Sequence, residues 1–155
     1  MSGYDNQSFR GTGPKALLER ADHLLVEALG EPVAADRFLT AYLAGLRGAD
    51  AVIALVIPAP AARRRKAAGG AWHTMARLAP EFALWSDYFA EYSALRASIM
   101  SGVSRSMSSE QADEFCSRVN AFLHDVEDHL GANARLPAHG AWDAAGVSRS
   151  EGLTA

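Results

Sequence analysis

The sequence predicts an all-α protein, an up-and-down bundle of four to five helices in a single domain. Large apolar residues recur at steps of three and four in four long stretches, and no strand-like alternation of useful length occurs. The 155 residues suffice for one domain with its own core but are few for two. We expect residues 14–131 to form the bundle, residues 1–13 a disordered lead and residues 132–155 a flexible tail.

A first helix is predicted over residues 14–30. Pro14 suits a first helical turn, and Gly30 is typical of a helix end. Between them the apolar residues form one stripe, and most charged residues lie outside it. The stripe consists of Leu17, Leu18, Ala21, Leu24, Leu25 and Ala28.

A second helix is predicted over roughly residues 34–57, with small residues through its middle. Ala41, Gly45 and Ala49 repeat at a spacing of four, which places them on one side of the helix. An interior glycine costs about 1 kcal/mol relative to alanine, so we expect the close approach of another backbone to offset the cost. That backbone belongs either to the same chain or to a second copy in a dimer.

Residues 58–70 are predicted to form an exposed loop, because two prolines open the segment and two glycines close it. Its middle holds four consecutive basic residues, Arg63, Arg64, Arg65 and Lys66. A formal net charge of −3 gives the chain no general attraction to nucleic acid. The basic run is therefore the best local patch for contact with phosphates, and solvated loop charge is the alternative interpretation.

Residues 71–100 predict an interrupted helix. Pro80 cannot donate a backbone hydrogen bond, so we expect a short helix to about Leu78 and then a kink or a new helix start. An aromatic stripe at helical spacing follows. No basic residues are interleaved with it, which favours core packing over a platform for stacking nucleobases. The stripe contains Phe82, Trp85, Phe89 and Tyr92.

The last helix is predicted over residues 108–131. Ser108 and Gln111 have the spacing of a capping box, and we expect Gly131 to end the helix in a left-handed conformation. The single cysteine, Cys116, excludes an internal disulfide and is predicted to be a packed, inert thiol beside the apolar stripe. That stripe consists of Phe115, Val119, Phe122, Val126 and Leu130.

No metal, cofactor or membrane is expected. The five histidines are scattered except for His124 and His129, whose spacing of five is poor for sharing a metal ion. No apolar run approaches the roughly 20 residues that span a bilayer. No secretory signal is visible at the start of the sequence, so we expect a cytoplasmic protein.

One spacing in the last helix suggests chemistry, that of Arg118 and His124. Such a pair can cleave RNA, with histidine moving a proton near the 2′-hydroxyl and arginine stabilising charge on the phosphate. Six residues turn a helix by about 240°, so the two side chains diverge by about 120° and need a partner subunit to meet. Surface ion pairs, such as that of Glu114 with Arg118, are the alternative interpretation.

The chain carries Tyr42-Leu-Ala-Gly-Leu-Arg47, an apolar run to Ile57 and the Pro/Arg-rich loop. The segment 71–85, Tyr88-Phe89 and the amphipathic last helix follow. Over roughly residues 14–131, this succession resembles a small actinobacterial family of HEPN domains. The resemblance implies a helical bundle that usually forms dimers. Many HEPN proteins are ribonucleases with an arginine and a histidine on a late helix, whereas others bind nucleotides or proteins.

The expected function is a non-catalytic, dimeric HEPN-like module that binds a protein, a nucleotide or a nucleic acid. Arg118 and His124 fit the length of the ribonuclease motif. The common motif has a polar residue after the arginine, whereas this chain has Val119 of the apolar stripe. The alternative is a metal-independent endoribonuclease with a composite site of Arg118 and His124 across a dimer.

Overall fold

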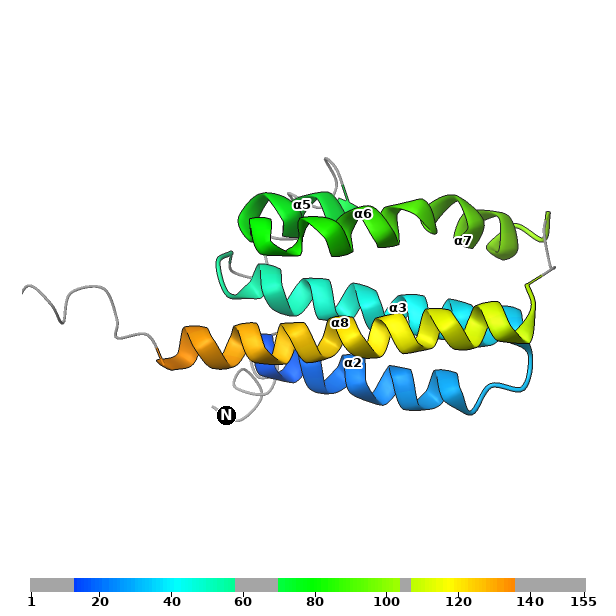
Figure 1. Ribbon diagram of the computed structural model, residues 1–155, viewed down its shortest axis with the longest axis horizontal. Coiled ribbons are helices and arrows are strands. Elements are labelled where there is room, and N and C mark those ends of the chain that lie inside the picture. Colours follow the sequence, from blue (N-terminus) through cyan, green and yellow to red (C-terminus); the bar gives the residue numbers. More distant parts are fainter. Residues whose placement is uncertain (1–12, 58–69, 104–106, 136–155) are drawn as a thin grey trace, which may run out of the picture.

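The computed structural model describes residues 13–57, 70–103 and 107–135, and these residues form a helical bundle (Figure 1). No strand occurs in them, so the predicted all-α fold is confirmed. The predictions for the lead, the basic loop and most of the tail fall on residues 1–12, 58–69 and 136–155, which lie outside the described part. The elements are α2 (Pro14–Leu29), α3 (Ala34–Ala54), α5 (Gly70–Leu78), the 3-10 turn η1 (Pro80–Phe82), α6 (Ala83–Glu91), α7 (Ser93–Met100) and α8 (Ser109–Arg135).

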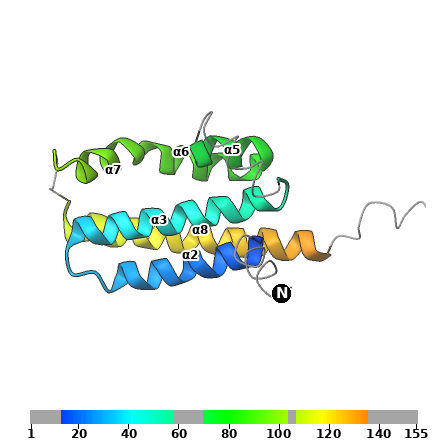
Figure 2. The same cartoon turned by 180° about the vertical axis from the view of Figure 1, so that it is seen from behind.

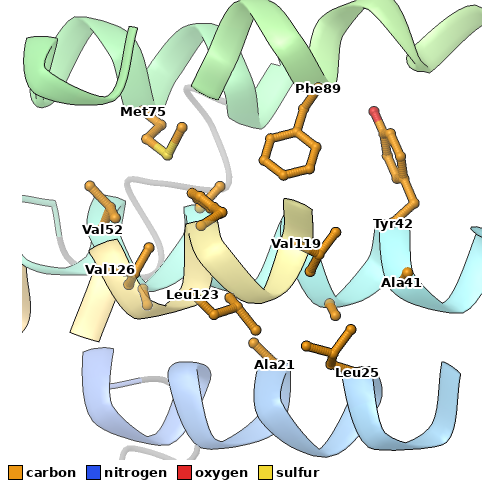
Figure 3. Packing of buried hydrophobic residues seen from close by; sticks show 14 of the residues in the cluster. Ala21, Leu25, Ala41, Tyr42, Val52, Met75, Phe89, Val119, Leu123 and Val126 are labelled. Carbon is orange, nitrogen blue, oxygen red and sulfur yellow. The ribbon is translucent and has the colours of Figure 1, made fainter. Parts of the chain in front are cut away.

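Three long helices, α2, α3 and α8, lie side by side along the bundle, and α5, α6 and α7 form a further layer over them (Figures 1 and 2). The core lies between these layers. In Figure 3, Phe89 and Met75 point from the α5–α6 layer toward α3 and α8, while Ala21 and Leu25 of α2 close the core from the other side. No helix within the described ranges combines the length and the apolar character that a membrane span needs.

Both predicted ends of α2 are confirmed. The helix begins at Pro14, and its last turn closes when the Gly30 N–H donates to the Glu27 carbonyl at 3.1 Å. Four members of the predicted stripe are buried, namely Leu18, Ala21, Leu25 and Ala28. The stripe therefore faces α3 and α8, as its period requires.

The small residues of α3 serve packing within the chain. A Cβ atom at Gly45 would lie 3.3 Å from the Trp72 ring, and one at Gly48 would lie 2.6 Å from a methyl group of Leu123. Ala41 and Ala49 are fully buried as well. The alternative use of these residues as a dimer seam is wrong, because the chain itself covers them.

The interruption predicted at Pro80 is confirmed. Helix α5 ends at Leu78, Ala79 leaves helical geometry with φ −135° and ψ 84°, and η1 starts at Pro80. The break lets α5 pack beside α6, and the Ser86 hydroxyl donates to the Trp72 carbonyl at 2.8 Å. A second break, at Tyr92 between α6 and α7, was not predicted.

The start of α8 is fixed by the predicted capping box. The Gln111 N–H donates to Ser108 Oγ, and the Ser108 N–H donates to Gln111 Oε1, both at 3.1 Å. Arg37 of α3 adds an ion pair to Asp113 at 2.7 Å and a hydrogen bond to Ser109 Oγ at 3.1 Å. The starts of α3 and α8 are therefore held together by polar contacts.

The end predicted for α8 is wrong. Gly131 does not adopt a left-handed conformation, and the helix continues to Arg135. Two alanines follow the glycine and favour helix continuation. The Asn133 side chain also donates to the His129 carbonyl at 2.9 Å across this last turn. The bundle therefore reaches four residues beyond the expected boundary at residue 131.

Candidate functional site

Arg118 and His124, the predicted catalytic pair, lie on different sides of α8. Arg118 is near Tyr88 of α6, and its charge lowers the pKa of that hydroxyl, although burial and a hydrogen bond to Tyr92 raise this pKa overall. His124 is near Asp22 of α2, where its charge acts to lower the carboxyl pKa. Both side chains are exposed. A single chain therefore does not bring the guanidinium and the imidazole into one site.

The aromatic stripe of α6 packs as predicted, with one edge toward solvent. Phe89 is fully buried and stacks on Trp72 with ring centroids 4.4 Å apart. Trp85 is half-buried, and its indole N–H donates to Asp125 Oδ2 of α8 at 2.8 Å. These rings fix α6 against α8 and leave no free face for stacking nucleobases at Phe89.

The remaining reactive side chains of α8 have structural partners. His129 Nδ1 lies 3.2 Å from Glu81 Oε1, and its imidazole packs edge-on against the Phe82 ring at 5.1 Å. Cys116 is buried, which confirms the predicted packing, and burial raises the pKa of its thiol. Among the described residues, no three acidic, histidine or cysteine side chains are grouped to hold a metal ion.

A groove of about 490 Å³ lies between α3, the start of α5 and the junction of α6 with α7. Its floor contains Tyr42 and Trp72, with the Trp72 indole N–H donating to the Tyr42 hydroxyl at 2.8 Å. The Arg96 guanidinium lies over the Tyr42 ring, 4.9 Å from its centroid, in a cation–π contact. His73 and Asp87, both exposed, supply further polar groups.

The unpredicted break at Tyr92 places Arg96 in this groove. The Ser93 hydroxyl donates to the Ala90 carbonyl at 2.7 Å, and the Arg96 N–H donates to the Tyr92 carbonyl at 2.9 Å. The chain thus resumes as α7 at Ser93, directly after the break, and Arg96, one turn beyond Tyr92, lies above Tyr42 of α3. Sequence reasoning missed Arg96, because its contact joins residues 54 positions apart and no local pattern marks it.

The basic run at residues 63–66 lies outside the described residues, but the groove lies where the chain returns from it. Gly70 and Ala71, the first residues of α5, line the groove. Lys66 precedes Gly70 by four residues, so their Cα atoms are at most about 15 Å apart.

The fold and its late amphipathic helix define a class, the HEPN-type helical bundles. A comparison with protein families matches residues 28–127 to the SAV_6107-like HEPN family, and the chain belongs to this family. The match covers α3, α5, α6 and α7 completely and α8 as far as Glu127, and it includes both Arg118 and His124. Searches of curated proteins and of solved structures gave no match.

Proposed function

We propose that this protein acts in the cytoplasm as a non-catalytic HEPN module that binds a nucleotide or a nucleic acid. The ligand's phosphates would contact Arg96 in the groove together with the basic run Arg63, Arg64, Arg65 and Lys66. One observation carries the proposal: Arg96 lies over Tyr42 in a groove whose lining includes Gly70, the first described residue after the segment with the basic run.

The groove suits a phosphorylated ligand chemically. Guanidinium groups bind phosphate oxygens through paired, charge-assisted hydrogen bonds, and Arg96 supplies a guanidinium group to this groove. His73 adds a second nitrogen ligand for phosphate when it is protonated. Asp87 can accept hydrogen bonds from ribose hydroxyls or base amino groups. A nucleotide has these donors, whereas inorganic phosphate does not.

The non-catalytic part of the proposal is supported by the geometry of α8. Arg118 faces α6 and His124 faces α2, so one chain does not present them together to one phosphate. Val119, beside Arg118, is fully buried and holds the helix in this orientation. Both side chains are exposed, however, so a second subunit could reach them. The alternative of a composite ribonuclease site therefore requires a dimer.

Binding is tested with a fluorescein-labelled single-stranded RNA of about 12 nucleotides and with a labelled ATP analogue, in a series of salt concentrations. We expect Arg96→Gln to weaken binding by about tenfold, as the loss of one charge-assisted contact. Binding constants are plotted as log K against log salt concentration. Neutralising the four residues 63–66 should make the slope of this plot less negative by about 3, because each contact with a single-strand phosphate contributes about −0.7 to it. Arg20→Gln, an exposed change on α2, is the matched control. Equal binding by all variants would contradict the proposal, and retention of only a protein partner from the native cell would favour a protein ligand.

Catalysis and assembly are tested separately. Purified protein incubated with mixed RNA should leave it intact; cleavage that is lost in both Arg118→Ala and His124→Ala would overturn the non-catalytic proposal. We propose a homodimer, and light scattering at micromolar concentration checks the mass. A monomer at that concentration would remove the composite ribonuclease site, since Arg118 and His124 do not meet in one chain.

A further inference from the structure

A second and larger groove, of about 740 Å³, is lined by residues from the start of α2 and from the ends of α3 and α8. Figure 1 shows these three helix ends at one end of the bundle. Its apolar surface comes from one leucine of each element, Leu18, Leu55 and Leu130. Leu18 is buried, whereas Leu55 and Leu130 are partly exposed. The groove lies at a different place from the Arg96 groove and shares no lining residue with it.

The groove exists because α8 continues through Gly131 with no side chain to fill the space. A Cβ atom built at Gly131 meets no atom within 4 Å. Ala134, one turn beyond Leu130, also contributes only a methyl group to the wall. Neither Gly131 nor Ala134 of α8 fills the space beside the start of α2, so an apolar hollow remains there.

The rim of this hollow is acidic. Asp22 of α2 and Glu127 of α8 face it together with Glu19, and Lys15 is the one basic residue among the described residues that line it. Burial raises the pKa of the Asp22 carboxyl, and the negative charge of Glu127 raises it further, while His124 and His23 act in the opposite direction. No ion pair within the described part of the chain includes Asp22 or Glu127.

We propose that this groove binds an amphipathic organic cation. The alkyl or aryl body lies on Leu18, Leu55 and Leu130, and the ammonium group lies between Asp22 and Glu127. The volume is within the range of about 300–1,000 Å³ that small-molecule sites occupy. The charge is complementary, because three carboxylates (Glu19, Asp22 and Glu127) and only one ammonium group (Lys15) are among the described lining residues, so the lining is negative overall. The proposal does not depend on phosphate binding at Arg96.

The test uses three probes that share one chain length: n-octylammonium, n-octanol and n-octanoate. Each is titrated into the full-length protein by isothermal calorimetry, with circular dichroism to verify that the fold is retained. We expect octylammonium to bind about tenfold more tightly than octanol, because a partly desolvated charge pair adds to the shared apolar contact. We expect octanoate not to bind. Equal binding of octylammonium and octanol, or no binding of either, would overturn the proposal.

Two variants locate the site. Gly131→Leu fills the hollow from within a helix and should abolish octylammonium binding while retaining the helical signal. The double variant Asp22→Asn/Glu127→Gln should reduce octylammonium binding to the level of octanol. Asp128→Asn, an exposed acidic change that does not line the groove, is the charge-matched control and should bind normally. Unchanged binding in Gly131→Leu would overturn the assignment. Binding of the peptide acetyl-Leu-Lys-Leu-amide without binding of octylammonium would also overturn it, in favour of peptide docking.

Discussion

The middle of α3 and the end of α8 each hold a glycine within a helix, but the surroundings of the two glycines are opposite. At Gly48 an added Cβ would lie 2.6 Å from Leu123 Cδ2 and 3.2 Å from Phe122 Cε1. At Gly131 it would meet nothing within 4 Å. One glycine permits a close helix contact, and the other leaves a groove. The same residue type therefore marks the tightest and one of the most open parts of the bundle.

The two glycines mark two parts of the bundle that differ in packing. In its middle, α3 and α8 pack closely against each other, and the aromatic rings beside this contact, Phe122 of α8 and Phe89 of α6, are fully buried. At the end of α8 the groove is lined by leucines that are only partly buried, Leu55 and Leu130. Stability is therefore expected to depend on the middle, whereas the open end is available for a ligand.

The largest expected effect is that of Phe122→Ala, which removes a fully buried ring beside Gly48. We expect a loss of about 3–5 kcal/mol in the free energy of unfolding, because the surrounding core cannot fill the cavity. Urea denaturation followed by circular dichroism measures the loss. The control is Leu130→Ala at the open end of the same helix, for which we expect about 1 kcal/mol, because its side chain is only partly buried. Equal losses would mean that the end is packed as firmly as the middle.

A smaller effect is expected for Gly48→Ala. Alanine gains about 1 kcal/mol of helix propensity but must displace Leu123 and press on Phe122, and such overpacking costs about 1–3 kcal/mol. We expect a net destabilisation of about 1 kcal/mol in urea denaturation. Gly131→Ala is the matched control and should stabilise the protein by up to about 1 kcal/mol, since the new methyl group enters open space. A stabilising Gly48→Ala would show that the close contact relaxes without cost.

Ser108→Ala tests the opposite end of α8, which is fixed by its capping box. Removing the hydroxyl leaves the Gln111 N–H without its acceptor, so we expect a loss of about 1 kcal/mol. Thermal unfolding followed by circular dichroism measures this loss. The exposed Ser117→Ala, in the middle of α8, is the control and should change the midpoint little. If Ser108→Ala has no effect, then Arg37 and its contacts alone hold this end.

The smallest expected effect is the pH dependence that Asp22 contributes. Burial raises the folded-state pKa of this carboxyl above its ordinary value of 3.8, so over a range of pH the folded protein retains a proton that the unfolded chain has lost. The contribution of Asp22 to the free energy of unfolding is therefore fully present below pH 3.8, and it is lost as the pH rises through the folded-state pKa. Asp22→Asn removes this loss. The variant should therefore gain stability relative to the wild type as the pH rises from below 4 to neutral, in urea denaturation at several pH values. A gain that appears only on acidification would contradict the assignment.

Much of the fold could be predicted from local patterns. The period of the apolar residues predicted the helices. Pro14 predicted the start of α2, the capping box predicted the start of α8, and Pro80 predicted the break after α5. These signals are local: proline lacks the backbone N–H that its own helical turn needs, and a capping box joins residues only three positions apart. The divergence of Arg118 from His124 also followed from the 100° turn per residue.

The rest could not be predicted, because it depends on contacts between distant segments. Whether Gly131 stops or continues a helix depends on the residues after it and on the space beside it, and a stop was the wrong expectation. The contact of Arg96 with Tyr42 requires both the break at Tyr92 and the packing of α7 near α3. The acidic groove combines three segments, of which the sequence shows only separate charges and leucines.

Trp72 is anchored by three neighbours: the Tyr42 hydroxyl, the Phe89 ring and the Ser86 hydroxyl that its carbonyl accepts. On the other side of residues 58–69, Ile57 is buried against the core. The chain thus leaves and re-enters the bundle at two independently secured points. The contacts at Trp72 and Ile57 come from the described helices and not from residues 58–69, so each end of this segment is fixed to the bundle by contacts outside it.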